Sequence, residues 1–332
     1  VVALMNSRRD VPALYAAARG GHRPSLARLV SFIERGNAEA REVGALAYPD
    51  AGGGFTVGIT GAPGAGKSTL TSAIVARMRT DGLRLGVLAI DPSSPFTGGA
   101  ILGDRVRMQE HALDDQVFIR SMATRGHLGG LALATPEAVR LLEATGRTWI
   151  LVETVGVGQV EVEIAGAADT TVVVVNPGWG DAVQANKAGL MEIADVFVIN
   201  KADRAGADDT RRDLEYMLDL SGHTAGHEPG DESWRPPVLS TVATSNEGID
   251  ELWEAIGTHR AHLETTGELA RRRERRFDDE LTRIMSAQLE ERARRLRSSD
   301  AFAELRGDVE HRRIDPWEAV GRLIESRPST QD

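Results

Sequence analysis

The stretch GITGAPGAGKSTL, residues 58–70, decides which fold this chain is expected to adopt. It holds Gly61, Gly66, Lys67 and Ser68 in the G-x-x-x-x-G-K-[ST] spacing of a phosphate-binding loop. The apolar run FTVGIT before it reads as a strand, and STLTSAIVARMRTDG after it reads as a helix. A glycine-rich turn between a strand and a helix is the setting that this motif requires, so we predict a site for nucleotide phosphates.

Each residue type in the loop has a chemical role. Glycines let successive backbone N–H groups turn toward the phosphates without a Cβ clash. Lys67 would bring a positive charge to the β- and γ-phosphates, and the helix N-terminus would add its dipole. The Ser68 hydroxyl is placed to ligate Mg²⁺.

Six more apolar runs alternate with helical segments downstream of the loop. They are LRLGVLAID, QVFIRS, TWILVE, TTVVVVN, DVFVIN and PVLST, between residues 83 and 241. Near-continuous runs of Val, Ile and Leu are typical of a parallel sheet that is covered on both faces. We therefore predict an α/β fold with a doubly wound, mostly parallel sheet, forming a nucleotide-binding P-loop domain over residues 51–262.

The composition of the 332 residues excludes several classes of protein. The formal net charge is −10, whereas a general nucleic-acid binder is normally basic, so no nucleic-acid partner is expected. The absence of cysteine excludes disulfides and thiolate metal sites and fits a reducing compartment. No apolar run reaches the length of about 18 residues that a membrane helix needs, and no secretory signal is visible at the N-terminus. We expect a cytoplasmic protein without a membrane partner.

The sequence on both sides of the sheet region is helical. VPALYAAARG and RPSLARLVSFIERGN lie within residues 1–50, and we expect an N-terminal helical extension there. Residues 263–332 are highly charged, and we interpret RRRERR (271–276) as a solvated helix face. One narrow apolar stripe remains, made by Leu281, Ile284, Met285 and Leu289. A long helix with such a stripe is often an oligomerisation arm, which we expect here.

The run VFVINKAD supplies a second nucleotide signal. Asn200, Lys201 and Asp203 follow an apolar strand in the N-K-x-D pattern that reads a guanine base. Asp203 would accept hydrogen bonds from N1–H and the 2-amino group of guanine, whereas adenine lacks that amino group and has an acceptor at N1. Ser240 and Thr241 end the next strand, where such proteins carry a base-contacting loop. GTP and GDP are therefore the expected ligands.

Three acidic residues are placed to serve Mg²⁺, which prefers oxygen ligands from carboxylates, phosphates and water. Asp91 and Glu153 each end a predicted strand, and Asp104 lies in the loop GGAILGDRVRM. Ligands in open α/β sheets bind at the carboxyl ends of strands, which favours the two strand-end acids. All three cannot coordinate directly beside Ser68 and two phosphate oxygens, so we expect some to act through water. For each acid, a helix cap or a surface position is the alternative.

Six motifs, in order along the chain, resemble those of one known family. They are GAPGAGKST, AIDPSSPFTGGAILGDR, SMATRGHLGGLA, VETVGVGQ, NPGWGDAVQANKAG and NKAD. Over most of residues 10–260 the chain resembles the MeaB/ArgK-type P-loop GTPases, whose human counterpart is the methylmalonic aciduria type A protein. The resemblance implies a homodimer, joined by a C-terminal helical dimerisation arm, that assists adenosylcobalamin-dependent methylmalonyl-CoA mutase. It would hydrolyse GTP slowly until the mutase accelerates it, gate cofactor loading and protect the mutase from inactivation.

The resemblance also assigns site residues by motif. Phosphate binding would fall to Gly61, Ala62, Pro63, Gly64, Ala65, Gly66, Lys67, Ser68 and Thr69. Mg²⁺ would be surrounded by Ser68, Asp91, Asp104 and Glu153, and guanine would be read by Asn200, Lys201 and Asp203. Residues 176–189 match a mobile switch, and Lys187 within it is expected to reach the nucleotide when the switch closes. Catalysis would rest on Lys67, Asp91, Asp104, Glu153 and Lys187.

The chain departs from the Ras-like pattern after the strand TWILVE. ETVG, residues 153–156, stands where D-x-x-G is usual, and Val157 rather than glutamine follows the glycine. Gln159 comes two residues late. The water-orienting glutamine is therefore absent from its usual place, and we predict slow intrinsic hydrolysis until a partner or a rearrangement of the dimer completes the site.

Four other functions remain open at this point. An ATP-dependent kinase linked to amino-acid transport is an older description of ArgK relatives, although Asn200 and Asp203 argue against ATP. A GTPase for another cobalamin-dependent acyl-CoA mutase would look the same in sequence. A metal-delivery GTPase would normally carry His-rich or Cys-containing stores, whereas this chain has no cysteine and eight scattered histidines. A nucleotide-gated scaffold, in which hydrolysis is incidental, is the alternative outside the enzymes.

Overall fold

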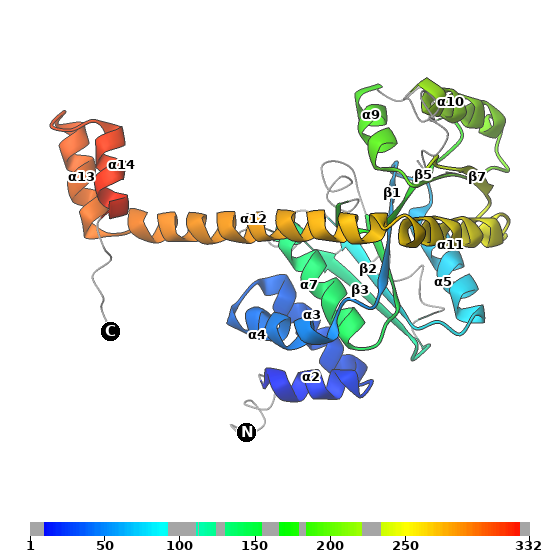
Figure 1. Ribbon diagram of the computed structural model, residues 1–332, viewed down its shortest axis with the longest axis horizontal. Coiled ribbons are helices and arrows are strands. Elements are labelled where there is room, and N and C mark those ends of the chain that lie inside the picture. Colours follow the sequence, from blue (N-terminus) through cyan, green and yellow to red (C-terminus); the bar gives the residue numbers. More distant parts are fainter. Residues whose placement is uncertain are drawn as a thin grey trace. The chain divides into compact units, whose positions relative to one another are not determined.

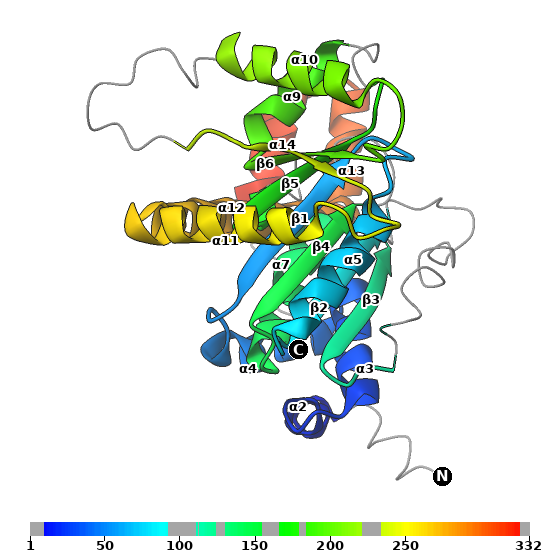
Figure 2. The same cartoon turned by 90° about the vertical axis from the view of Figure 1, so that its right-hand side faces the viewer.

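The computed structural model describes residues 10–91, 111, 113–123, 130–154, 166–178, 184–220 and 234–325. The chain divides into two compact units, Val1–Phe277 and Asp278–Asp332. The larger unit contains a β-sheet with helices on both of its faces (Figures 1 and 2). None of the helices in the described segments is both long enough and apolar enough to span a membrane.

The described residues of the larger unit form one seven-stranded parallel sheet, in the order β3-β2-β4-β1-β5-β6-β7 (Figure 2). The strands are β1 (Phe55–Gly61), β2 (Leu85–Asp91), β3 (Val117–Ala123), β4 (Trp149–Thr154), β5 (Thr170–Val175), β6 (Val196–Asn200) and β7 (Val238–Thr241). The predicted apolar runs are all strands, and the doubly wound α/β fold is confirmed. Because the winding reverses beside β1, a ligand site is expected at the carboxyl end of this strand.

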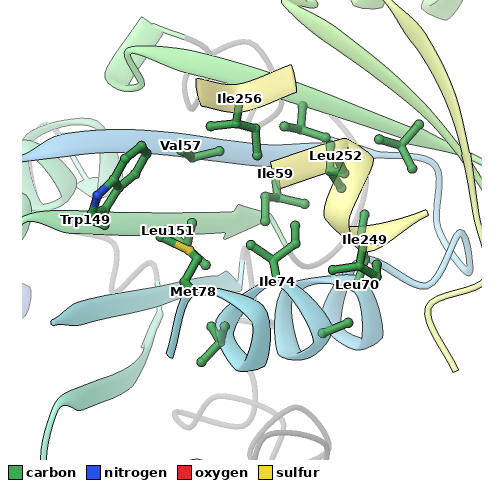
Figure 3. Packing of buried hydrophobic residues seen from close by; sticks show 14 of the residues in the cluster. Val57, Ile59, Leu70, Ile74, Met78, Trp149, Leu151, Ile249, Leu252 and Ile256 are labelled. Atoms are coloured by element: carbon green, nitrogen blue, oxygen red, sulfur yellow. The ribbon is translucent and has the colours of Figure 1, made fainter. Parts of the chain in front are cut away.

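Helices cover both faces of the sheet. On one face lie α5 (Lys67–Thr80) and α11 (Ile249–Thr265), whose apolar side chains meet those of β1 and β4 (Figure 3). The opposite face is covered by α2 (Val11–Arg19), α3 (Arg23–Arg35), α4 (Ala38–Ala47), α7 (Gly130–Ala144), α9 (Gln184–Ile193) and α10 (Ala207–Leu220). A short 3-10 helix, Tyr48–Asp50, follows α4, and α12 (Glu268–Arg297) follows α11.

The strand sequences explain this layering. In β4, Trp149 and Leu151 belong to the core under α5 and α11, whereas Ile150 and Val152 belong to the core under α7 and the N-terminal helices. Side chains alternate between the faces of a strand, and all residues of β1, β4 and β5 are buried. Full burial of one such aliphatic side chain is worth about 1.5–3 kcal/mol, so an uninterrupted apolar strand is stable only where helices cover both faces.

The arginine run at the start of α12 is only in part the solvated face that we predicted: Arg271 and Arg275 are exposed, but the other three arginines are not. Arg273 and Arg276 both bind Asp169, and Arg272 binds Asp195 across 2.9 Å. The two aspartates precede β5 and β6 and are 2% and 6% exposed. Burial of an unpaired carboxylate is costly, so the arginines are required to neutralise them. For Arg272, Arg273 and Arg276 the prediction was wrong because it considered the run without the aspartates, which lie far away in the sequence.

The smaller unit contains the rest of α12, then α13 (Asp300–Glu310) and α14 (Pro316–Glu325). α13 and α14 pack against each other, and Ala319 and Leu323 are buried. Other large apolar side chains of this unit are exposed, namely Leu281, Met285 and Leu289 on α12 and Trp317, Val320 and Ile324 on α14. Leu281, Met285 and Leu289 are four residues apart and therefore share one face of α12, and an exposed apolar helix face of this kind is typical of a contact surface.

Candidate nucleotide-binding site

Four strand ends at the carboxyl edge of the sheet carry most of the predicted site residues. They belong to β1, β4, β6 and β7. Side-chain hydrogen bonds connect them: Ser68 contacts Glu153, Asn200 and Lys201 contact the phosphate loop, and Thr241 contacts Asn200. The sheet therefore gathers residues that lie far apart in the sequence.

The phosphate loop depends on glycine at particular positions. Gly61, Gly64 and Gly66 have φ angles of 128°, 73° and 91°, a region that other residues rarely adopt. A Cβ on Gly61 would lie 2.0 Å from the carbonyl oxygen of Val174 in β5. A Cβ on Gly66 would lie 2.5 Å from Asn200 Nδ2. At these two positions the loop packs so closely against its neighbours that only glycine fits.

Lys67 is held at the start of α5. Its Nζ donates hydrogen bonds to the carbonyl oxygens of Gly61 and Ala62, at 2.7 and 3.2 Å. The side chain is buried, so the loop fixes the ammonium group against its own backbone. Backbone N–H groups at a helix N-terminus favour an anion, and a positive charge beside them strengthens that preference.

Ser68 and Glu153 meet beside the phosphate loop. Ser68 Oγ donates to Glu153 Oε1 across 2.6 Å, and both side chains are buried. A hydroxyl and a carboxylate supply the oxygen ligands that Mg²⁺ prefers, so these residues fit the ion. Within the described segments, no cluster of three or more His, Cys, Asp or Glu could hold a metal. Nucleotide oxygens and water would therefore have to complete the coordination.

Five residues that the sequence analysis singled out are described only in part or not at all. Asp91 ends β2, which neighbours β4 in the sheet, but its side chain is outside the described residues. Lys187 lies in α9, and its side chain is likewise outside them. Asp104, Val157 and Gln159 lie wholly outside the described residues. The roles assigned to these positions stay predictions.

Asn200 and Lys201 join the base-reading segment to the phosphate loop. Asn200 Nδ2 donates to the carbonyl oxygen of Ala65 at 2.8 Å, and Lys201 Nζ donates to that of Gly64 at 2.6 Å. Lys201 has a φ of 61°, which is uncommon for a residue with a side chain and is often found at functional sites. Asp203, two residues further on, is exposed, so its carboxylate is open to a base.

The strand-end pair Ser240 and Thr241 has two different surroundings. Thr241 Oγ1 and the Ala243 N–H both donate to Asn200 Oδ1 at 3.2 Å, so the end of β7 and the loop after it orient the asparagine amide. Ser240 instead accepts a hydrogen bond from Arg211 Nη2 at 2.9 Å. We did not predict that the Ala243 N–H would contact Asn200, because a contact made by the backbone leaves no side-chain signal in the sequence.

A second polar cluster lies at the amino edge of the sheet. His259 is fully buried, with Nδ1 2.8 Å from Thr170 Oγ1 and Nε2 3.3 Å from Asp195 Oδ1. Burial, together with the charge of Arg272, lowers the pKa of His259 to about 3. Burial also raises the pKa of Asp195 above its ordinary value, although Arg272 opposes this. The order Thr-His-Asp resembles a nucleophilic triad, but complete burial of the imidazole leaves no room for a substrate.

The sequence matches one known family over residues 26–298, and this family is described as methylmalonyl Co-A mutase-associated GTPase MeaB. The chain belongs to the MeaB family. It is accordingly a P-loop GTPase, which confirms the predicted resemblance and enzyme class.

Relatives of this MeaB-family chain carry consistent names. A Pyrococcus abyssi protein named as a GTPase is 51% identical over 304 residues, covering 92% of this chain and 93% of the relative. The GTPase ArgK of Escherichia coli is 39% identical and covers 76% of each chain. The mitochondrial methylmalonic aciduria type A homolog of Mus musculus is 36% identical, covering 80% of this chain and 67% of the relative. A solved structure titled LAO/AO transport system kinase is 28% identical, with a TM-score of 0.68 and coverage of 95% and 96%.

Proposed function

We propose that this GTPase is a chaperone of methylmalonyl-CoA mutase that gates adenosylcobalamin loading and protects the mutase. The match to a family described by its association with that mutase carries the proposal. GTP and GDP are the proposed ligands. Asn200 and Lys201 bind the phosphate loop directly, and the exposed Asp203 offers the acceptor that guanine requires.

Mg²⁺ is proposed to accompany the nucleotide. The contact between Ser68 and Glu153 supports this, because two buried oxygen-bearing side chains stand beside Lys67. The bound ion would neutralise charge on the phosphate oxygens. Asp91 and Asp104 are proposed as additional ligands, directly or through water. Lys67 and Lys187 are proposed to bring positive charge to the reacting phosphates.

Hydrolysis by the protein alone is proposed to be slow. The support is in the sequence, since Val157 occupies the position of the water-orienting glutamine of Ras-like GTPases. A rearrangement on binding the mutase would supply what the isolated site lacks. GTP turnover would then report that the partner is present.

A homodimer formed through residues 263–332 is also proposed, beside an N-terminal helical extension at 1–50 and a GTPase domain at 51–262. The exposed apolar residues of the smaller unit support it, because a second copy could cover them. The remaining proposals are a cytoplasmic location and the absence of nucleic-acid and membrane partners. The formal net charge of −10 supports the absence of a nucleic-acid partner.

An ATP-dependent kinase is the second candidate, because one similar solved structure is titled LAO/AO transport system kinase. The surroundings of Asn200 favour the GTPase, since its amide is oriented by Thr241 at the end of β7 and by Ala243 after it, where such proteins carry a base-contacting loop. A GTPase for another cobalamin-dependent acyl-CoA mutase remains compatible with every contact described. The partner must therefore be identified by experiment.

The decisive experiment mixes the purified chain with each candidate cobalamin mutase and measures GTP turnover and mutase survival together. We expect methylmalonyl-CoA mutase, and none of the other candidate mutases, to stimulate GTP turnover. Stimulation by a different acyl-CoA mutase would reassign the partner, and stimulation by none would contradict the chaperone proposal. An Asp203→Ala variant is the control, because protection that survives loss of GTP binding would indicate a scaffold.

A further inference from the structure

Three arginines gather at the amino edge of the sheet, opposite the edge that carries the nucleotide residues. Arg147 lies two residues before β4, Arg84 directly precedes β2, and Arg23 is the first residue of α3. Leu85 pairs with Trp149, so the first two arginines stand at the starts of neighbouring strands. A Cβ added to Gly146 would lie only 2.9 Å from Arg84 Nη1. The guanidinium of Arg84 therefore lies close to the backbone next to Arg147.

Arg147 is unusual because it is buried without a described acidic partner. It is 4% exposed, and its Nη1 donates to the carbonyl and hydroxyl oxygens of Thr145. The guanidinium lies 5.3 Å from the centre of the Phe118 ring, and its Nε has no hydrogen-bond partner among the described residues. Burial lowers the pKa of Arg147 to about 10, and the charges of Arg84 and Arg23 add to the effect.

The start of α3 adds positive potential to the same region. Arg23 Nη1 donates to the carbonyl oxygen of Asp114, which precedes β3. The Asp115 carboxylate forms a long ion pair with this guanidinium at 3.8 Å, but it is 88% exposed, so water screens its charge. The first turn of α3 contains no acidic residue, and the side chain of His22 contacts Ser25 Oγ and does not cap the helix. An uncapped helix start favours an anion.

We propose that Arg23, Arg84 and Arg147 form a second anion site, which binds a phosphate group outside the nucleotide site. A buried guanidinium destabilises the fold unless an anion neutralises it, and two neighbouring cations increase that cost. Guanidinium groups match phosphate oxygens in charge and geometry. Arg147 forms the buried base of the site, while the exposed Arg84 and the half-buried Arg23 meet the ligand from solvent. The competing explanation is that Arg147 only caps the C-terminal end of α7.

The test uses the whole chain saturated with GDP and Mg²⁺, so that the phosphate loop is already occupied. Its unfolding temperature is followed as inorganic phosphate replaces chloride at constant ionic strength. We expect a saturable rise, because a ligand of the native state stabilises it by mass action. The apparent affinity should fall about tenfold or more in R84Q, and the response should vanish in R147M. R322Q, which removes an exposed arginine of α14, should respond like the unaltered protein.

Two further measurements keep the test decisive. If R147M does not fold, R84Q and R23Q replace it, because both side chains reach solvent. Phosphoserine is titrated in parallel: binding tighter than that of inorganic phosphate assigns a phosphate monoester, and equal or weaker binding assigns free phosphate. A response that is absent in the unaltered protein, or unchanged in R84Q and R23Q, overturns the proposal and leaves Arg147 as a helix cap.

Discussion

Ser68 donates a hydrogen bond to Glu153 across 2.6 Å, and this contact joins the start of α5 to the end of β4. Strand β4 pairs directly with β1, which leads into the phosphate loop. The carboxylate is therefore fixed next to the loop by sheet register and does not depend on a bound nucleotide for its position.

Glu153→Gln should leave GDP binding nearly unchanged and slow Mg²⁺-dependent GTP hydrolysis by about tenfold or more. Glutamine can still accept the Ser68 hydrogen bond, but it has no charge to attract a cation. The measurement is single-turnover hydrolysis over a range of Mg²⁺ concentrations. Glu143→Gln is the control, since this half-buried acid accepts the Gly52 N–H and lies away from Ser68. Unaltered hydrolysis in Glu153→Gln would leave Glu153 a structural residue.

Asp203→Asn should weaken GDP binding by about a hundredfold and create a preference for xanthosine diphosphate. Xanthine has a carbonyl where guanine has its 2-amino group, so it suits the asparagine amide. Competition binding with GDP, ADP and the xanthosine nucleotide measures the change. Equal binding of ADP and GDP by the unaltered protein would remove the guanine assignment and favour the kinase.

Gly61→Ala should destabilise the nucleotide-free protein by more than about 4 kcal/mol, whereas Gly64→Ala should cost about 1–2 kcal/mol. Both glycines have positive φ, but only the Cβ at Gly61 would strike backbone, at the Val174 carbonyl. A Cβ on Gly64 meets nothing within 4 Å in the described structure. Urea unfolding compares the two variants, and similar losses would show that the close contact with β5 does not matter.

Arg273→Met should destabilise the protein by about 2 kcal/mol, less than the cost of about 3–5 kcal/mol for a wholly broken buried pair. The loss is partial because Arg276 continues to bind Asp169. Arg271→Met is the control two positions earlier. Arg271 pairs with Glu268 in solvent, so its loss should cost less than about 0.5 kcal/mol. Equal stability of the two variants in urea would restore the solvated-face interpretation of this run.

Stability should fall by about 1.4 kcal/mol between pH 7.5 and 5.5 because of His259 alone. The folded pKa of about 3 lies below the unfolded value, so the unfolded chain binds the extra proton as pH drops toward the folded pKa. The native state therefore keeps its full stability above the unfolded pKa of His259 and loses stability as the pH falls below that value. Denaturant unfolding of His259→Asn across this range should show a shallower pH dependence, and an unchanged slope would contradict the burial argument.

Much of the fold could be predicted because it depends on local patterns. An uninterrupted apolar run such as TTVVVV is compatible only with a covered strand, and the phosphate motif fixes a strand, a turn and a helix in order. The positions of Lys67 and Asn200 could be predicted because ligand-binding residues in open α/β sheets lie at the carboxyl ends of strands.

The rest could not be predicted because it depends on pairs distant in sequence. Nothing local distinguishes Arg273, which binds a buried aspartate, from Arg271, which faces solvent. Likewise, no local signal separates Thr241, which orients Asn200, from Ser240, which contacts Arg211. Strand alternation turns the two side chains in different directions, and only the tertiary neighbours determine what each one meets.

Asn200 and Lys201 each donate a hydrogen bond to a carbonyl oxygen of the phosphate loop. Binding of the wrong base should therefore also weaken the contacts of the loop with the phosphates. A base that pulls this segment out of place would also disturb the backbone at Ala65 and Gly64. The wrong purine would then lose affinity in two ways: it would make fewer contacts with the base-reading residues, and the phosphate loop would hold its phosphates less well. Substitutions in the two segments should consequently be non-additive, and nucleotide release should behave as one cooperative event.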